Sequence, residues 1–98
     1  MPRICRHRDL GTTGHPCTPI IGVRATQGSV FANGIPIARR GDPTRPHLIL
    51  KGIVCRGHMS KVKSSSGTVF AQGIGVARIG DAYDFGAMIK GSGNVSAG

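Results

Sequence analysis

Apolar residues along this chain stand in short runs that are separated by glycine-containing turns. In "VFANGIPIAR", residues 30–39, a short β-prone run is followed by an Asn-Gly pair and by a second short run. Asn-Gly suits the two positive φ angles of a type I′ turn, so the pattern predicts a β-hairpin. Residues 69–78, "VFAQGIGVAR", repeat this pattern with Gln-Gly, a weaker turn signal. The chain is therefore predicted to consist of short hairpins.

These hairpins belong to an internal repeat. Residues 28–42 and 67–81 align without a gap, 39 positions apart, and are identical at ten of fifteen positions. The C-terminal "GNVSAG", residues 93–98, matches the beginning of the unit, so a truncated third copy is expected there. Phe31 and Phe70 occupy matching positions and are predicted to pack into a shared core.

Each full copy ends in a Gly-Asp turn, "RRGD" in the first and "RIGD" in the second. The carboxylates of Asp42 and Asp81 are predicted to accept hydrogen bonds from nearby backbone amides. The Arg-Gly-Asp sequence at 40–42 is interpreted as part of this turn and not as an adhesion motif, because the second copy keeps only Gly-Asp.

Composition supports a small all-β domain spanning residues 1–98. Sixteen glycines and six prolines argue against long helices. Three Phe, one Tyr and no Trp make a lean core, of the kind that a metal, disulfides or a partner often supports. The basic N-terminus lacks the apolar run of a signal peptide, so synthesis in the cytoplasm is expected. Three cysteines cannot all pair within one chain.

The net charge of +9 attracts phosphate-bearing partners. The basic residues are spread along the chain, and four aromatic residues cannot build much of a platform for stacking bases. Nucleic acid is therefore not the expected partner. A small basic zinc-binding module for nucleic acid nevertheless stays open as the alternative function.

Four histidine and cysteine positions are candidate metal ligands. Cys55 and His58 can face one side of a short turn, and His15 and His47 would have to arrive from other segments. Their spacing alone is only suggestive and leaves open separate surface histidines and an inert buried cysteine. The same residues could form a Cys-His nucleophile pair. No group is placed to orient that pair and the chain has no Glu, so we do not expect an enzyme.

The repeated "NGIPIARRGD" and "QGIGVARIGD" resemble the motif of PAAR-repeat proteins. The likeness extends from about residue 9 to Gly98 and includes "GHPC", the His after the first Gly-Asp, a later Cys and His, and the terminal "GSGNVSAG". The motif itself falls on two sets of four residues: Pro36, Ile37, Ala38 and Arg39, and Gly75, Val76, Ala77 and Arg78.

The resemblance implies a small cone of β-hairpins with pseudo-threefold PAAR repeats. Proteins of this family cap and sharpen a trimeric β-helical needle that pierces membranes in type VI secretion systems or contractile phage tails. The chain would be a monomer by itself and would bind one spike trimer through its base. It would be assembled at the tip of a virion tail or secretion apparatus and would contact the target outer membrane transiently. No effector extension is expected.

The resemblance also implies a metal, zinc or alternatively iron, near the apex of the cone. Three His and one Cys hold it in the family, and the matching residues are His15, His47, Cys55 and His58, with Cys17 as an alternative sulfur ligand. Two positions depart from the family. Phe85 stands where many relatives have Cys, and Ser96 stands where Phe is common. Cys5 and His7 are expected to be an unligated basic N-terminus.

Overall fold

The computed structural model describes residues 1–98, apart from the side chain of Lys51. Its strands pair in five short antiparallel hairpins, which makes the chain all-β as expected. In chain order the strands are β1 (Leu10–Thr12), β2 (Ile20–Gly22), β3 (Phe31–Ala32), β4 (Ile35–Pro36), β5 (His47–Lys51), β6 (Val54–His58), β7 (Phe70–Ala71), β8 (Ile74–Gly75), β9 (Ala82–Tyr83) and β10 (Gly86–Ala87). Within the described chain, no helix is long and apolar enough to cross a membrane.

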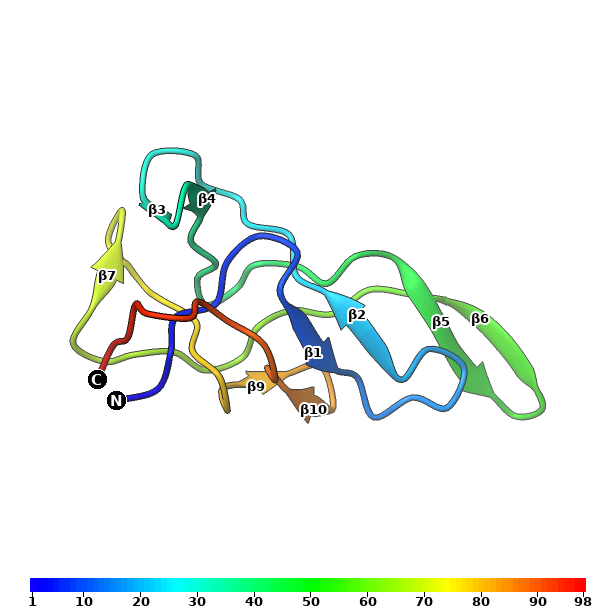
Figure 1. Cartoon of the computed structure of the whole chain (residues 1–98). Helices are drawn as coiled ribbons and strands as arrows, with labels where there is room; N and C mark the ends of the chain where they lie inside the picture. The colour runs from blue at the N-terminus through cyan, green and yellow to red at the C-terminus, as the bar shows by residue number, and fades with distance from the viewer.

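The molecule is elongated and tapers from a broad end to a narrow one. Its principal extents are 41 × 23 × 21 Å. Figure 1 shows β3, β4, β7 and both chain termini at the broad end, whereas the β5–β6 hairpin forms the narrow end. We call the β3–β4 and β7–β8 hairpins the base hairpins, and β1–β2, β5–β6 and β9–β10 the arm hairpins.

The two predicted hairpins of the repeat are confirmed as the base hairpins. Their turns have two consecutive positive φ angles, 56° and 76° at Asn33 and Gly34, and 50° and 79° at Gln72 and Gly73. The Gln-Gly pair therefore makes the same turn as Asn-Gly, although its sequence signal is weaker.

The prediction that Phe31 and Phe70 fill a shared core is wrong. Their side chains are 52% and 56% exposed. Successive residues of a strand point to opposite faces, and the next residue in each copy, Ala32 and Ala71, is the one that faces inward. The two phenylalanines therefore lie on the outside of the broad end.

The third repeat copy is not truncated, because the N-terminal segment completes it. Residues 93–97 take the place of its first strand and residues 2–6 the place of its second, joined by an isolated bridge between Arg3 and Ser96. Ile4 donates its backbone N–H to Val95 at 2.8 Å, and Ala97 donates to Pro2 at 3.0 Å. The chain ends thus meet at the base, as Figure 1 shows, and form a third unit equivalent to the two base hairpins.

A closed ring of three backbone hydrogen bonds joins the three copies. Ala38 N–H donates to Cys5 C=O at 3.0 Å, Cys5 to Ala77 at 2.9 Å, and Ala77 to Ala38 at 2.9 Å. All three side chains are completely buried. This central ring gives one chain an approximate threefold symmetry, which realises the pseudo-threefold repeat expected from the family resemblance.

Each ring residue is followed directly by a turn of the same kind, which runs from an Arg to an Asp. The carboxylate of the Asp accepts a hydrogen bond from the backbone N–H of the Arg three positions earlier, as predicted for Asp42 and Asp81. The N-terminal segment makes the same turn at Asp9. After each turn an arm hairpin begins, and it returns to the body at Val23, Val62 or Met88, which donate their N–H groups to the C=O of Asp9, Asp42 and Asp81.

The core consists of two clusters of buried side chains, of which the first contains the three ring residues. One cluster contains Cys5, Val23, Ala38, Val62, Ala77, Tyr83 and Met88; the other contains Ile4, Ala32, Ile37, Ala71, Val76 and Ala97. Burial, with a smaller contribution from Asp9 and Asp81, raises the pKa of the Cys5 thiol to about 12. Cys5 is therefore an unreactive core residue, and neither it nor His7 belongs to the group of candidate metal ligands described below.

Replacing Gly11 by Ala tests the packing of β1 on this core. A Cβ at Gly11 would overlap the ring of Tyr83, which is fully buried and cannot move aside. We expect G11A to lower the free energy of unfolding by about 2–3 kcal/mol in urea denaturation. G28A is the matched control, because its Cβ would meet no atom within 4 Å. Equal stability of the two variants would contradict the packing described here.

Candidate metal centre

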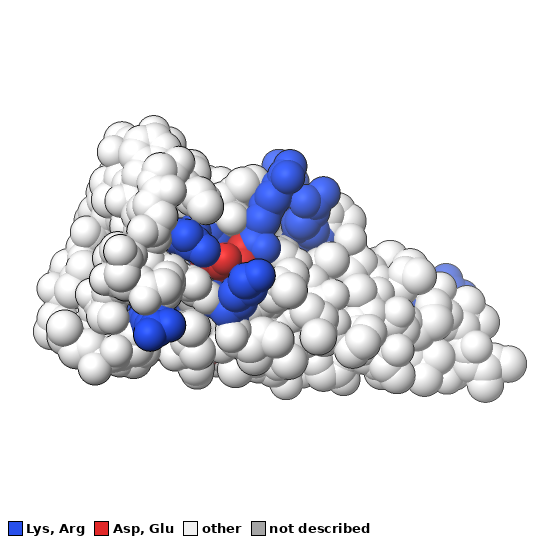
Figure 2. Space-filling view, in the orientation of Figure 1, with Lys and Arg blue, Asp and Glu red and all other residues white. Residues whose placement is uncertain are grey.

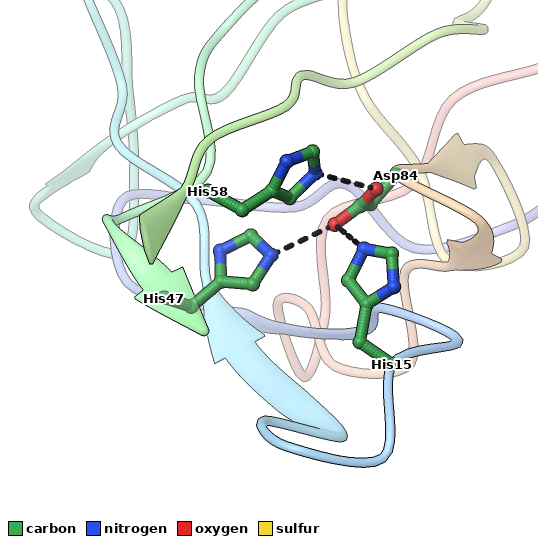
Figure 3. A group of neighbouring side chains, drawn as sticks. All are labelled: His15, His47, His58 and Asp84. Atoms are coloured by element: carbon green, nitrogen blue, oxygen red, sulfur yellow. Dashed lines mark hydrogen bonds and ion pairs between the residues drawn. The ribbon is translucent and has the colours of Figure 1, made fainter. Parts of the chain in front are cut away.

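Three histidines and one aspartate converge where the narrow end leaves the body. Ligand-type atoms of His15, His47, His58 and Asp84 all lie within 4.8 Å of one another. Figure 3 shows the three imidazole rings directed at the carboxylate of Asp84. His15 and His47 have their Nε2 atoms 2.9 Å from Asp84 Oδ2, and His58 Nε2 lies 3.4 Å from Oδ1.

Each arm hairpin contributes to this group. His15 lies in the connection between β1 and β2, where its N–H donates to Thr13 Oγ1 at 3.0 Å. His47 and His58 face each other across the open end of β5–β6. Asp84 occupies the turn between β9 and β10 with a φ of 56°, a left-handed conformation that Asp tolerates. The candidate ligands therefore come partly from the β5–β6 hairpin and partly from two connections between strands, not from loops alone.

The backbone around His47 fixes its proton on the ring nitrogen that faces away from the group. The Nδ1 atom lies 2.9 Å from the C=O of Arg45, which can only accept, so Nδ1 carries the hydrogen. A bound metal would meet the lone pair of Nε2; without a metal, a second proton on Nε2 would let the ring donate to Asp84 Oδ2, which lies 2.9 Å away. An outer carbonyl that orients an imidazole in this way is a common feature of metal sites.

The Asp84 carboxylate is held in its ionised form. Burial alone would raise its pKa, but the contacts with His58, His15 and His47 outweigh that effect and keep the pKa below its usual value. A buried anion facing three imidazole nitrogens supplies the negative charge that a divalent cation requires.

The group fits a metal ion on the evidence of its own atoms. His15 Nε2 is buried and lies 2.9 Å from Asp84, yet it has no hydrogen-bond partner with acceptable geometry among the described residues. A buried polar atom without a partner is costly unless something else binds it. Imidazole nitrogens and a carboxylate oxygen are ligands that zinc accepts, in a set of four. A metal held by them would cross-link the three arm hairpins.

The predicted sulfur ligands are not part of this group. Cys55 was expected as the fourth ligand with Cys17 as its alternative, but a disulfide joins the two, with Cα atoms 6.0 Å apart. Neither sulfur is a free thiolate in this state, so Asp84 replaces Cys55 in the candidate ligand set. The same bond removes the thiol that a Cys-His nucleophile pair would need.

Phe85, noted above as a departure from the family pattern, covers one side of the cluster. Its ring packs edge-on against His15 with centroids 5.2 Å apart, and the Lys63 ammonium lies 4.8 Å from its centroid. The adjacent Asp84 supplies the candidate ligand atom, whereas Phe85 supplies an apolar contact.

Asp84 was missed by sequence reasoning, although one signal could have found it. The other three aspartates each follow an Arg by three positions, at Arg6–Asp9, Arg39–Asp42 and Arg78–Asp81, and serve the repeated turn. Asp84 is the one that lies outside this pattern. A carboxylate without a place in the repeat was therefore free for another role.

In a comparison with protein families, the family model of the PAAR motif matches residues 10–91, which is most of the chain. A search of curated proteins found no match.

Removal of the Asp84 carboxylate is expected to weaken metal binding. D84A should lower the affinity for zinc by more than about 100-fold, since even partners outside the ligand shell are commonly worth 10–100-fold. Competition with a chromophoric chelator measures this. R56Q, an exposed change on β6 beyond the cluster, is the control and should bind like the unmodified chain. Unchanged affinity in D84A would exclude Asp84 as a ligand.

The disulfide is expected to stabilise the narrow end. It links positions 38 residues apart, and closing a loop of that length corresponds to about 4 kcal/mol in the chain-entropy description. Reduction should therefore lower the free energy of unfolding by up to about 4 kcal/mol. The C17S/C55S double variant should have the stability of the reduced chain and should not respond to reductant. A reductant effect of the same size in that variant would contradict this assignment.

Proposed function

The chain belongs to the PAAR-motif family, and from this premise we propose that it is a structural spike-tip protein. It caps and sharpens a trimeric β-helical, membrane-piercing needle of a contractile injection machine, either a phage tail spike or a type VI secretion spike. One chain binds one trimer. The role is mechanical and not catalytic.

The observation that carries this proposal is the central ring of Cys5, Ala38 and Ala77. It gives a single chain three equivalent units around one axis. A monomer with that symmetry offers each of three identical spike chains a similar surface, which an asymmetric small domain could not do.

The broad end has the surface chemistry of a docking face. Phe31 and Phe70 are more than half exposed at equivalent positions of the two base hairpins. Val69 and Ile74 beside them are 36% and 37% exposed. Burying these apolar side chains against the end of a β-helix would provide the binding free energy, and the partner's strands would cover the short strand edges.

The narrow end has the cross-links that a piercing point needs. The candidate metal centre ties three arm hairpins together, and the disulfide ties β1–β2 to β5–β6. Disulfides form in oxidising compartments. A chain made in the cytoplasm would therefore carry these two thiols reduced, and the bond would form once the tip reaches the cell envelope.

Native mass spectrometry of the metal-loaded chain with the C-terminal fragment of its trimeric spike tests the proposal. We expect a complex of one tip chain, three spike chains and one metal ion. The F31D/F70D double variant should weaken that complex by at least about 100-fold, because two buried aromatic side chains are replaced by charges. The I53D variant, changed at the 98% exposed Ile53 of the narrow end, should bind normally.

A metal-loaded chain that forms no complex with the spike would overturn the capping role. Binding to nucleic acid that falls steeply with salt concentration would instead support the alternative of a small basic zinc-binding module.

A further inference from the structure

A basic hollow on the side of the body is lined by side chains that take no part in the candidate metal centre, although the backbone C=O of Arg45 orients His47. It encloses about 350 Å³ and is lined by His7, Arg8, Arg24, Arg45 and Pro46. Figure 2 shows Lys and Arg side chains gathered over the middle of the molecule, with few near the narrow end. The hollow lies where the arm hairpins join the body, because Arg8 precedes β1, Arg24 follows β2 and Arg45 precedes β5.

Backbone pairing brings the three arginines together. Arg8 donates its N–H to the C=O of Val23 at 2.8 Å, and Arg24 donates to Pro43 at 2.9 Å. Arg45 donates to the C=O of Gly22 at 3.1 Å. Three segments far apart in the sequence thus lie side by side, and each carries one guanidinium to the same place.

No carboxylate neutralises these guanidinium groups among the side chains that the structure describes. Asp9 pairs with Arg6 at 3.0 Å and Asp81 with Arg78 at 3.0 Å. Asp42 is bonded to the backbone of its own turn and to Thr26, and Asp84 faces the three histidines. Three like charges at one hollow repel one another, so a bound anion would relieve an unfavourable interaction.

His7 adds a hydrogen-bond donor to the hollow. The backbone N–H of Ala25 donates to His7 Nδ1 at 3.1 Å. Because Nδ1 accepts this bond, the ring proton is on Nε2, which is then the available donor.

Arg8 is kept at a position where the backbone favours glycine. Its φ is 71°, and the equivalent residues of the other two copies are Gly41 and Gly80, with φ of 90° and 93°. A non-glycine residue in this conformation costs free energy, and such strain is typical of functional positions. One of the three pseudo-equivalent turns thus has an arginine where the other two have glycine.

We propose that this hollow binds a phosphate group, either free phosphate or the phosphate of a lipid head group. Arginine forks pair with the oxygens of phosphate through two parallel N–H bonds each. A tetrahedral anion has enough oxygens for several forks and the His7 donor, whereas a carboxylate has only two. Phosphate binding would be a function additional to the proposed capping, because the hollow remains accessible while the broad end is docked.

The affinity of the hollow for phosphate can be measured by titrating the metal-loaded chain with inorganic phosphate. The NMR signals of the arginine and His7 side-chain N–H groups report the binding. Salt of about 0.15 M screens diffuse surface charge. The R8Q/R24Q/R45Q variant should bind phosphate at least about tenfold more weakly. The R3Q/R40Q/R56Q variant loses the same charge at three exposed arginines elsewhere and should change the affinity by less than about twofold.

The single variant R8G separates binding from folding. Glycine relieves the left-handed backbone at this position, so the melting temperature should stay the same or rise. Phosphate affinity should nevertheless fall, by about threefold or more. A residue with a purely structural role would produce the opposite pattern, a loss of stability with unchanged phosphate binding.

Vesicles identify the source of the phosphate group. Binding to phosphatidylcholine vesicles containing phosphatidic acid, lost in R8Q/R24Q/R45Q, would support a lipid head group, and binding of inorganic phosphate alone would support the free anion. The proposal is overturned if neither probe binds, or if R8Q/R24Q/R45Q and R3Q/R40Q/R56Q lose binding equally. Binding of duplex DNA that both variants weaken alike would also overturn it, since that result identifies diffuse charge.

Discussion

The fold depends on the close approach of three backbone segments around one axis. Cys5, Ala38 and Ala77 exchange hydrogen bonds in a closed ring with every side chain fully buried. Only small side chains allow three backbone segments to meet in this way, and the ring satisfies buried amide groups that would otherwise be costly. Because each ring residue continues into the same Arg-to-Asp turn, the ring fixes where all three arm hairpins begin.

The broad end of the molecule keeps the approximate threefold symmetry, whereas the arm hairpins depart from it. The base keeps three similar units, a form suited to a threefold partner. The arms differ, because β5–β6 is long and β9–β10 is short. That difference gives His15, His47, His58 and Asp84 four distinct positions around one point. Departures from the repeat also mark the basic hollow, where Arg8 stands in place of glycine.

A disulfide offsets a thin core, and a metal ion held by the histidine–aspartate group would add to that effect. Most residues of β6 are exposed, so hydrophobic burial contributes little at the narrow end. The Cys17–Cys55 bond anchors this exposed hairpin, and the largely buried histidine–aspartate group lies at its open end. Structural zinc in small domains contributes on the order of 10 kcal/mol, which is comparable to the whole stability of an ordinary domain.

The sequence by itself determined the local elements: the base hairpins follow from Asn-Gly and Gln-Gly, and the turns at Asp42 and Asp81 follow from Gly-Asp, because turn chemistry depends on neighbouring residues. The three histidines were also readable from the family resemblance. Tertiary structure alone decided that the chain ends close a third unit, that Phe31 and Phe70 face outward, that Cys17 pairs with Cys55 and that Asp84 joins the histidines. Each of these depends on which distant segments the central ring brings together, and spacing along the chain carries no information about that.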